Sequence, residues 1–541
     1  MAEATKKGMF EEDSVRSFRT EERRVIFASS LGTVFEWYDF YLYATLAPFF
    51  AALFFPPGNA TAALLSAFVT YAAGFLVRPF GALVFGRIGD LVGRKYTFLI
   101  TIIVMGASTT GVGLLPTYAS IGFVAPLLLV TLRLLQGLAL GGEYGGAATY
   151  VAEHAPHGKR GYDTSWIQTT ATLGLFMALI VIGLCRWKMG ADTFKNWGWR
   201  LPFLLSVVLL AFSVYIRLKL QESPIFKAMK SQGKGSRAPL KDSFTNWANL
   251  KIVLLALFGA TAGQGVVWYA GQFYALFFLT LYLKVDYLTA YILIGASLLI
   301  GTPFFIVFGA LSDRIGRKWI IMLGCLIAAV TYFPLFKALT HNVNPALEHY
   351  AASTPITVSA SDCQMHIFPT PKTRYSDCDK AKDFLTKSGL SFQSLPEVPG
   401  ETVVTKIGPV ELRGYSEDKY KAALKTTGYP ATFDKTALNW PITILILFIL
   451  VVYVTMVYGP IAAFLVELFP TRIRYTSMSL PYHIGNGWFG GMLPLLATAI
   501  VASRGNIYAG LWYPIIVALM SFVIGSLFIR ETKDRDIRHD F

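Results

Sequence analysis

The sequence predicts an all-α membrane protein of twelve transmembrane helices in two pseudo-symmetric six-helix bundles, with a small insert on the outer face. Three observations lead to this fold class. Of the 541 residues, 54% are hydrophobic and only 15% are charged, and the mean hydropathy is +0.50, which excludes an ordinary soluble domain. About half of the chain falls into twelve apolar stretches, each near the roughly 20 residues that cross a bilayer. Motifs of the first half recur in the second.

The apolar stretches give both the spans and the domain boundaries. The spans are expected at residues 25–55, 62–85, 96–115, 121–150, 164–185, 199–218, 250–281, 287–311, 319–339, 441–466, 474–502 and 506–529. The expected domains are an N-terminal tail (1–24), a first bundle (25–218), a central loop (219–249), a second bundle (250–339 and 441–529), the insert (340–440) and a C-terminal tail (530–541). The N-terminal tail lacks the apolar core of a secretory signal, so the first span is expected to be retained.

The distribution of Lys and Arg predicts the orientation. Six of them precede the first span and seven lie between residues 217 and 241, whereas the short loops on the opposite side carry six together. Basic loops stay on the cytoplasmic side of a membrane. Both termini are therefore expected in the cytoplasm, in a cell membrane that would be the inner membrane of a Gram-negative host. The net charge of +15 then needs no nucleic-acid partner.

The insert is expected to be an aqueous segment on the outer face, because it has no apolar run of 18 residues. Its two cysteines, Cys363 and Cys378, would face an oxidising compartment in a bacterium with a periplasm, so we expect a disulfide there. Two unrelated free thiols are the alternative. Cys185 and Cys325 lie at or within spans and are expected to be packing residues.

Two motifs repeat between the halves. Gly86-Arg87-Ile88-Gly89-Asp90-Leu91-Val92-Gly93-Arg94-Lys95 recurs 223 residues later as the segment that ends Asp313-Arg314-Ile315-Gly316-Arg317-Lys318. Glu153, Pro156 and Arg160 recur 314 residues later as Glu467, Pro470 and Arg474. The two offsets differ by 91, which is close to the length of the insert. Parallel six-span repeats with one interruption are an architecture of transporters.

These residues resemble the major facilitator superfamily, and within it the metabolite:proton symporter family. The resemblance covers nearly the whole chain except the insert. Besides the repeated loop motif, it rests on Glu36-Trp37-Tyr38-Asp39-Phe40, Arg78-Pro79-Phe80-Gly81, Arg133-Leu134-Leu135-Gln136-Gly137, Trp199-Arg200-Leu201-Pro202-Phe203 and Glu467-Leu468-Phe469-Pro470-Thr471-Arg472. It implies a cavity lined by spans one, four, seven and ten, and an alternating-access cycle.

The resemblance also implies that the repeated loop charges form a conformational latch. Charges of the two halves would bridge while the outside is open, and would separate when the inside opens. The candidate latch residues are Asp90, Arg94, Asp313, Arg317, Glu143, Glu153 and Glu467. The alternative is solvated loop charges that serve only the topology, worth about 0–1 kcal/mol per exposed pair. We expect that alternative for Arg160 and for the lysines.

Three charges are expected deep in the bilayer, where a charge usually faces a cavity or a partner. At 1.5 Å per residue, Glu36 lies about 17 Å from the start of span one, and Asp39 shares its helix face. Arg133 of span four reaches a similar depth. Burial favours a protonated carboxyl group and a neighbouring arginine opposes it, so Glu36 and Asp39 are candidates for proton coupling. The alternative is a permanent salt bridge that only orients the two spans.

The candidate substrate-binding residues are Arg133, Gln136, Tyr269, Gln272 and Asn486. An arginine can bind a planar carboxylate through two parallel hydrogen bonds, which favours an organic acid or a zwitterion as substrate. Helix packing is the equal alternative for Tyr269 and Gln272, and for Phe273 and Tyr274 packing is expected. We expect His483 to be a buried core residue whose hydrogen bonds are made within the protein. We expect Arg78 to pack against a helix terminus, with substrate contact as the alternative.

The sequence therefore predicts a secondary active transporter, a proton symporter for a small organic acid or zwitterionic metabolite. We expect it to act as a monomer in the lipid bilayer, with no cofactor, no metal and no enzyme activity, because it has no nucleotide-binding loop and no catalytic cluster. A proton-coupled exporter is one alternative, which would need a greasier cavity and no Arg133. A membrane sensor whose insert binds the ligand is the other, although the cytoplasmic segments are short and basic.

Overall fold

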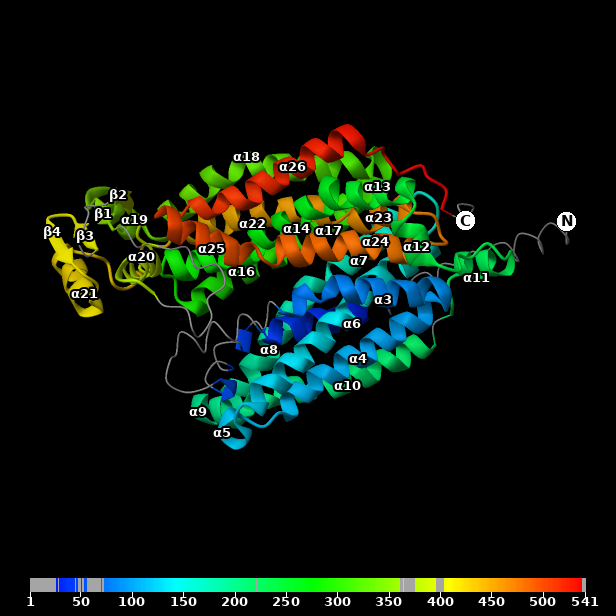
Figure 1. Cartoon of the computed structure of the whole chain (residues 1–541), viewed down its shortest axis with the longest axis horizontal. Helices are drawn as coiled ribbons and strands as arrows, with labels where there is room; N and C mark the ends of the chain where they lie inside the picture. Colours follow the sequence, from blue (N-terminus) through cyan, green and yellow to red (C-terminus); the bar gives the residue numbers. More distant parts are fainter. Residues whose placement is uncertain are drawn as a thin grey trace, which may run out of the picture.

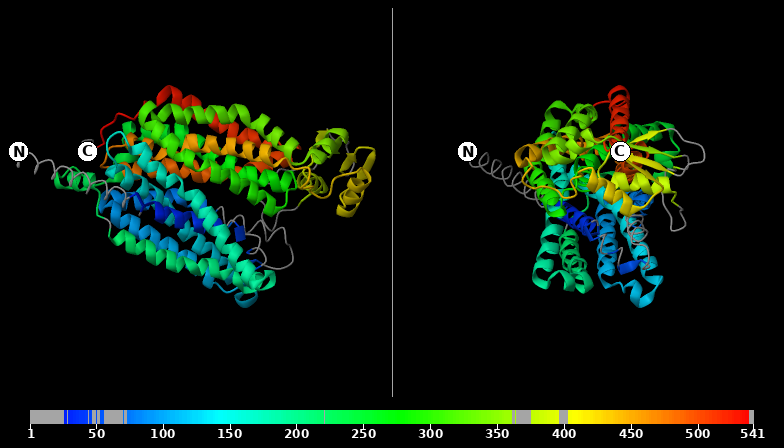
Figure 2. Two further views of the ribbon diagram at one scale, coloured as in Figure 1. Left: turned by 180° about the vertical axis from the view of Figure 1, so that it is seen from behind. Right: turned by 90° about the vertical axis from the view of Figure 1, so that its left-hand side faces the viewer.

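The structure is a computed structural model that describes residues 26–27, 29–43, 45–46, 50, 53–55, 70, 73–219, 221–360, 363, 375–395 and 403–537. Two helical bundles lie side by side (Figures 1 and 2). A small unit of strands and helices lies at one end of the molecule, which we term the insert end, and residues 530–537 lie at the other, which we term the tail end.

The first bundle contains the helices that precede the central loop. Its helical residues 29–43 lie within the first expected span, and α3 begins in the second expected span and extends six residues beyond it. The bounds are α3 Arg78–Leu91, α4 Arg94–Leu114, α5 Tyr118–Ile121, α6 Val124–His154, α7 Arg160–Gln168, α8 Thr170–Met189, α9 Ala191–Thr193, η1 Phe194–Gly198 and α10 Arg200–Leu218. Helices α11 Pro224–Ser231 and α12 Pro239–Phe244 belong to the central loop. Glycines let α6 and α3 approach closely, since a Cβ on Gly141 would lie 2.2 Å from the carbonyl oxygen of Arg78.

The second bundle contains the helices that follow the central loop, interrupted once by the insert. The bounds are α13 Trp247–Ala256, η2 Leu257–Thr261, α14 Ala262–Tyr269, η3 Ala270–Tyr274, α15 Ala275–Phe277, η4 Phe278–Tyr282, α16 Tyr287–Gly301, α17 Pro303–Ile315, α18 Arg317–Val343, α22 Trp440–Tyr458, α23 Ile461–Leu468, α24 Arg474–His483, η5 Ile484–Gly490, α25 Leu493–Arg504, η6 Ala509–Leu511 and α26 Trp512–Phe528.

The described residues contain 10 helices long and apolar enough to cross a membrane. Each of the 10 overlaps one of the expected spans three to twelve. The differences are only a few residues in, for example, Trp247–Tyr282 and Arg474–Arg504. Together with the helical residues 29–43 and α3, they account for all twelve expected spans. Parts of the first two spans lie outside the described residues.

Two spans of the second bundle contain irregular helical segments. Span seven contains the π-helical segments η2, η3 and η4, and span eleven contains η5. Such segments leave backbone groups without their usual helical partners, and they are frequent at functional sites. The Thr261 hydroxyl donates a hydrogen bond of 2.7 Å to the carbonyl of Pro481 in α24, which joins the two spans.

The unit at the insert end is a small α/β fold. Its elements are α19 Pro345–Ser353, β1 Ile356–Ser359, α20 Asp377–Lys387, β2 Gln393–Leu395, β3 Val404–Ile407, β4 Val410–Arg413 and α21 Glu417–Thr426. The sheet has the order β2-β1-β3-β4, in which β1 is parallel to β2 and antiparallel to β3. Cys363 and Cys378 form a disulfide there. Burial raises the pKa of the Tyr420 hydroxyl in its core to about 12, although the hydrogen bond to Thr405 opposes the shift.

The hydrogen bonds that anchor this unit reach the second bundle. The backbone N–H of Phe392 donates to the carbonyl of Gly505 at 2.6 Å, and the Asn344 side chain donates to the carbonyl of Leu283 at 2.9 Å. Lys435 forms an ion pair of 3.2 Å with Asp286 at the start of α16. The unit is therefore attached to the insert end of spans seven, eight and eleven.

Candidate functional site

At the tail end, one aspartate of each bundle caps a helix of the other bundle. Asp90, at the end of α3, accepts hydrogen bonds from the backbone N–H groups of Tyr475 and Thr476, which open α24, at 3.3 and 2.9 Å. The first N–H groups of a helix lack intrahelical acceptors and carry its positive dipole end, so a carboxylate binds them well.

The second aspartate repeats this arrangement in the opposite direction. Asp313, in α17 of the second bundle, accepts hydrogen bonds from the N–H groups of Gly161 and Tyr162, which open α7 of the first bundle, at 2.9 and 2.8 Å. The two bundles are therefore joined at the tail end by two equivalent caps. Two of the expected latch residues thus lie between the bundles.

Buried ion pairs surround each cap. Arg94 lies 2.9 Å from Asp90 and 3.7 Å from Glu153, and Glu153 lies 2.8 Å from Arg474 of the other bundle. In the second network, Arg317 lies 2.8 Å from Asp313 and 3.0 Å from Glu467. Each glutamate thus links an arginine of its own bundle to an arginine of the other one.

Two expectations for the tail end were wrong. Arg160 was expected to be a solvated loop charge, but it is buried and pairs with Glu467 at 3.3 Å, because it opens α7 inside the contact between the bundles. Glu143 was expected among the residues that bridge the halves. It instead forms an ion pair with Arg217 and accepts a hydrogen bond of 2.8 Å from Thr101, and both partners belong to its own bundle.

A second pair of glutamates completes the two networks, and the sequence reasoning missed it. Glu222 accepts hydrogen bonds from the N–H groups that open α4, and Glu531 accepts from those that open α18. The hydroxyls of the following residues, Ser223 and Thr532, donate to Glu153 and Glu467. The signal was present in the sequence, because Glu-Ser at 222 recurs as Glu-Thr 309 residues later.

Gly93 and Gly316 make room for these glutamates. As the sequence predicts for tight turns, both have left-handed backbone angles, with φ of 147° and 111°. A Cβ on Gly93 would lie 2.2 Å from Glu222 Oε2, and a Cβ on Gly316 would lie 2.4 Å from Glu531 Oε2. A side chain at either position would therefore displace the glutamate.

Deeper in the first bundle, a chain of hydrogen bonds connects Asp39 to Arg133. Arg133 donates to Gln136 Oε1 at 2.6 Å, Gln136 donates to Thr109 Oγ1 at 2.6 Å, and Thr109 donates to Asp39 Oδ2 at 2.6 Å. Ser206 of α10 donates to the other carboxylate oxygen of Asp39 at 3.0 Å. The Arg133 guanidinium also lies 3.9 Å from the centre of the Tyr43 ring. Sequence reasoning did not identify Thr109 or Ser206.

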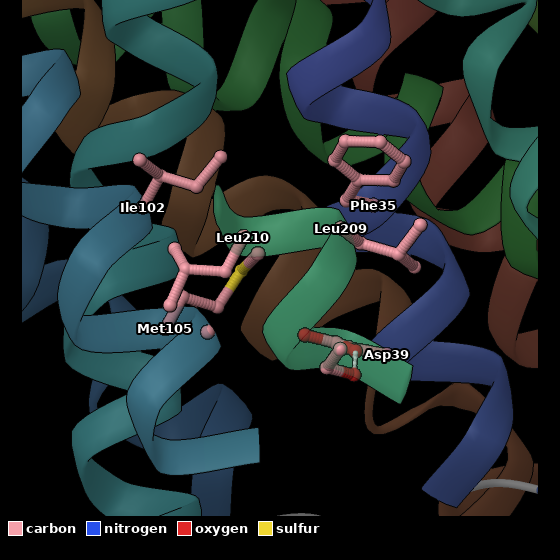
Figure 3. Close-up of a pocket in the computed structure, with 8 residues that line it drawn as sticks. Phe35, Asp39, Ile102, Met105, Leu209 and Leu210 are labelled. Carbon is pink, nitrogen blue, oxygen red and sulfur yellow. Dashed lines mark hydrogen bonds between the residues drawn. The ribbon is translucent and has the colours of Figure 1, made fainter. Parts of the chain in front are cut away.

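A small cavity adjoins Asp39 (Figure 3). Its volume is about 10 Å³, close to the minimum for one water molecule. Apolar side chains make up most of the wall, and Asp39 and Ser206 contribute its polar atoms. The carboxylate therefore has room for one water molecule inside the bundle. The lining residues are Phe35, Asp39, Ile102, Met105, Gly106, Ser206, Leu209 and Leu210.

Glu36 has different surroundings from Asp39, although both lie on the same helix. The side chain is buried, and among the described residues its Oε2 atom has no hydrogen-bond donor. Its electrostatic neighbours include Glu143 and Arg78. The Arg78 guanidinium lies 4.4 Å from the centre of the Phe75 ring, which contacts Tyr269 of the second bundle at 6.1 Å. Arg78 therefore lies near the contact between the bundles.

The expected residues of the second bundle are buried, and Asn486 has a hydrogen-bond partner there. The amides of Gln264 and Asn486 exchange two hydrogen bonds of 3.0 and 2.8 Å, which join spans seven and eleven. Gln272 and His483 are both buried. Asn486 thus contacts a partner within its own bundle.

Aromatic rings close the mid-membrane contact between the bundles. Trp37 lies 5.1 Å from Trp268, and Phe273 stacks on Tyr41 at 5.8 Å. Tyr144 of α6 stacks on Tyr482 of α24 at 3.6 Å. The packing role expected for Phe273 agrees with these contacts.

Comparisons with known proteins identify the class of protein. The sequence profile of the family "Sugar (and other) transporter" matches residues 25–253. The chain is 38% identical over 339 residues to the inner membrane metabolite transport protein YhjE of Escherichia coli, and the match covers 60% of this chain and 74% of the relative. It is 34% identical to the proline/betaine transporter of Salmonella typhimurium, with 59% and 65% of the two chains covered.

A solved structure shows the same fold. The proton:xylose symporter XylE of the major facilitator superfamily superimposes with a TM-score of 0.63 at 15% sequence identity, over 96% of this chain and 98% of the other. By sequence, the chain belongs to the family of metabolite transport proteins that includes YhjE, and it is a multi-pass membrane protein. Its fold is that of the major facilitator superfamily symporter, and the described residues supply 10 of the membrane-spanning helices.

Proposed function

We propose that the protein is a secondary active transporter that moves a small organic acid or zwitterionic metabolite together with protons by alternating access. The observation that carries this proposal is the hydrogen-bonded chain from Arg133 through Gln136 and Thr109 to Asp39. It connects a cation that can bind a carboxylate to a buried carboxyl group that can carry a proton. The proline/betaine relative, whose name gives a zwitterionic substrate, supports the same class.

The chain of hydrogen bonds suggests how substrate and proton are coupled. When a substrate carboxylate binds the Arg133 guanidinium, the hydrogen bond from Arg133 to Gln136 breaks. The Gln136 side chain can then move and end its own hydrogen bond to Thr109. The Thr109 hydroxyl also lies 3.0 Å from the carbonyl of Met105, so it can turn there and stop donating to Asp39. Asp39 then loses a donor that favours its charged form, and it takes up a proton. Substrate and proton are thereby bound in the same state of the protein.

The tail-end networks supply the conformational part of the cycle. With both caps formed, the two bundles are held together at the tail end, which supports a state open or opening at the insert end. We place the tail end in the cytoplasm, because the basic loops lie there. Opening toward the cytoplasm must then release the backbone groups of α24 from Asp90 and those of α7 from Asp313. A single chain contains both bundles, so a monomer suffices.

Transport by the purified full chain tests the proposal. Proteoliposomes are loaded at a pH above that of the medium and offered a panel of radiolabelled organic acids and betaines. The expected result is accumulation of one compound that requires the pH gradient and stops when a protonophore dissipates it. Uptake that only equilibrates, or that follows a sodium gradient instead, would contradict proton coupling. Export of lipophilic cations with no uptake of acids or zwitterions would favour an exporter.

A further inference from the structure

A surface hollow at the tail end has no place in the transport mechanism. It measures about 380 Å³ and lies between α3 of the first bundle and α12 of the central loop. This volume is in the range of ordinary small-molecule sites. The lining residues are Leu83, Val84, Arg87, Ile88, Leu91, Val92 and Leu240. Six of these seven side chains are aliphatic, and Arg87 supplies the one charge.

The hollow lies on a face of α3 that is exposed to lipid. Phe80, Val84 and Val92 are more than half exposed, and they follow one another at helical spacing along this face. An exposed apolar stripe on a transmembrane helix contacts acyl chains. Because α3 ends at Leu91, within the repeated loop motif, we place the hollow at the depth where the membrane meets the aqueous phase.

Arg87 is the feature that the latch does not explain. The other charges of its motif, Asp90 and Arg94, are buried in the tail-end network, whereas Arg87 is exposed, and the described residues offer it no ion pair. The offset of 223 residues places Ala310 at the equivalent position of the second half. A charge that served the latch would be expected in both halves. We infer that Arg87 has a separate role, which is confined to the first half.

Charge and position together indicate the occupant. Arg87 lies one turn before the end of α3, with aliphatic lining residues on both sides of it along the helix. The site therefore offers one cation to a phosphate and an apolar wall to a hydrocarbon chain. Arginine is well suited to phosphate oxygens. The central loop adds further positive charge beside α12, from Lys219 to Lys241. Basic segments at the cytoplasmic surface attract the anionic lipids of that leaflet.

The hollow also depends on the state of the transporter. Helix α12 contacts both α3 and α24, and Ser243 of α12 lies 2.8 Å, hydroxyl to hydroxyl, from Ser477 of α24. One wall therefore belongs to the first bundle, while the other is tied to the second bundle. When the bundles part at the tail end, α3 and α12 part as well, and the site is lost. A ligand of the hollow must then favour the state in which the tail end is closed.

We propose that the hollow between α3 and α12 binds one anionic phospholipid of the cytoplasmic leaflet, with the phosphate at Arg87, and that this lipid stabilises the tail-closed state. The proposal rests on the orientation given under the proposed function. It does not depend on which substrate is carried or on proton coupling.

Lipid counting on the full-length protein tests the binding. The protein is transferred to phosphatidylcholine nanodiscs with increasing phosphatidylglycerol, and the retained phosphatidylglycerol is counted by native mass spectrometry. We expect one copy bound to the wild type and about fivefold weaker binding to Arg87→Gln, since a basic residue near the surface contributes about that factor. Arg314→Gln is the matched control, because Arg314 is an exposed arginine of the repeated motif that does not line the hollow. Equal losses in both variants would overturn the proposal.

A second variant tests whether the lipid binds in the hollow, and a deletion tests whether the N-terminal tail occupies the hollow instead. Val84→Trp fills the hollow without changing the charge, and it should also displace the lipid. Deletion of residues 1–24 tests whether the N-terminal tail, which carries six acidic and six basic residues, occupies the hollow instead. If only the deleted protein binds phosphatidylglycerol, the tail is the occupant and the lipid proposal fails.

The effect on conformation is measured separately. Spin labels at His157 and Ile315, one in each half at the tail end, report the separation of the bundles. Phosphatidylglycerol should raise the short-distance population in the wild type and leave Arg87→Gln unchanged. An equal shift in both proteins would contradict a role for Arg87. Because none of these measurements uses substrate or a pH gradient, they remain informative if proton coupling fails.

Discussion

The two bundles are nearly equivalent at the tail end and differ at mid-membrane. At the tail end, Asp90 and Asp313 each cap a helix of the other bundle. Every other member of the first network has a counterpart in the second. At mid-membrane, the first bundle buries the charged side chains of Asp39 and Arg133. The second bundle has the neutral amide pair of Gln264 and Asn486.

This difference separates two tasks. Closing the tail end needs equal contributions from both bundles, because each must release the other at the same time. Coupling to a proton needs only one titratable group that senses the substrate, so it can reside in one bundle. In the proposed cycle, the first bundle is the site of coupling, and the second bundle provides a neutral wall against which the substrate can be held.

The largest expected effect is the loss of coupling in Asp39→Asn. An asparagine keeps the hydrogen-bond acceptor but cannot carry a proton. With a gradient of about two pH units, one proton per substrate can drive about 100-fold accumulation, which should fall to about onefold in the variant. Exchange of labelled for unlabelled substrate should persist, which shows that the protein is folded. The measurement is uptake into proteoliposomes at equal protein content.

His483→Gln is the matched variant in the second bundle, since His483 is also buried and titratable. It should keep most of the accumulation. Loss of accumulation in His483→Gln with retention in Asp39→Asn would reverse the comparison between the bundles.

The next largest effect is expected for Gly93→Ala and Gly316→Ala. Each substitution forces a side chain into a left-handed backbone and against a glutamate, which costs about 1–3 kcal/mol. Both should lower the midpoint of thermal unfolding by similar amounts. Gly122→Ala is the control, because Gly122 also has positive φ but no atom within 4 Å of the added Cβ. A loss no greater than that of the control would show that the glutamates do not need this space.

A smaller effect is expected for Asp90→Asn and Asp313→Asn. The amide oxygen can still accept one N–H group, but the charge that binds the helix end is lost. We expect the tail-closed state to be destabilised by about 1.4 kcal/mol relative to the tail-open state. The tail-open fraction should then rise about tenfold in each variant. It can be followed as the rate at which a cysteine at the buried position Ser479 reacts with a thiol reagent added from the tail side.

Equal effects in the two variants would support the equivalence of the caps. An exposed aspartate at the insert end, Asp192, provides the control as Asp192→Asn. If only one of the two cap variants opens the tail end, the symmetry seen in the structure has no energetic counterpart.

The smallest effect is expected for the amide pair. A double-mutant cycle with Gln264→Leu and Asn486→Leu should give a coupling energy of about 0.6 kcal/mol, the average for hydrogen bonds between membrane helices. Accumulation of substrate should change by less than about fivefold. A loss as large as that of Asp39→Asn would place a coupling function in the second bundle as well.

Much of the fold could be predicted from the sequence, because the spans are set by hydropathy and the halves by repeated motifs. The repeated aspartates were found for the same reason. Glu143 was misjudged because depth along a helix does not reveal which neighbour a side chain meets. Thr109 and Ser206 were missed because hydroxyl side chains are common in these spans, and only helix packing selects the two that face Asp39. The short strands of the insert gave no clear pattern.

Because the insert is attached to the second bundle alone among the described contacts, it is expected to move with that bundle during transport. The hydrogen bonds from Phe392 to Gly505 and from Asn344 to Leu283 fasten it to the second bundle. A modest rotation of that bundle then sweeps the tip of the insert through a wide arc above the membrane surface. A fluorophore on its exposed face, at Lys419 for example, would report each turnover from the aqueous side without altering a transmembrane residue.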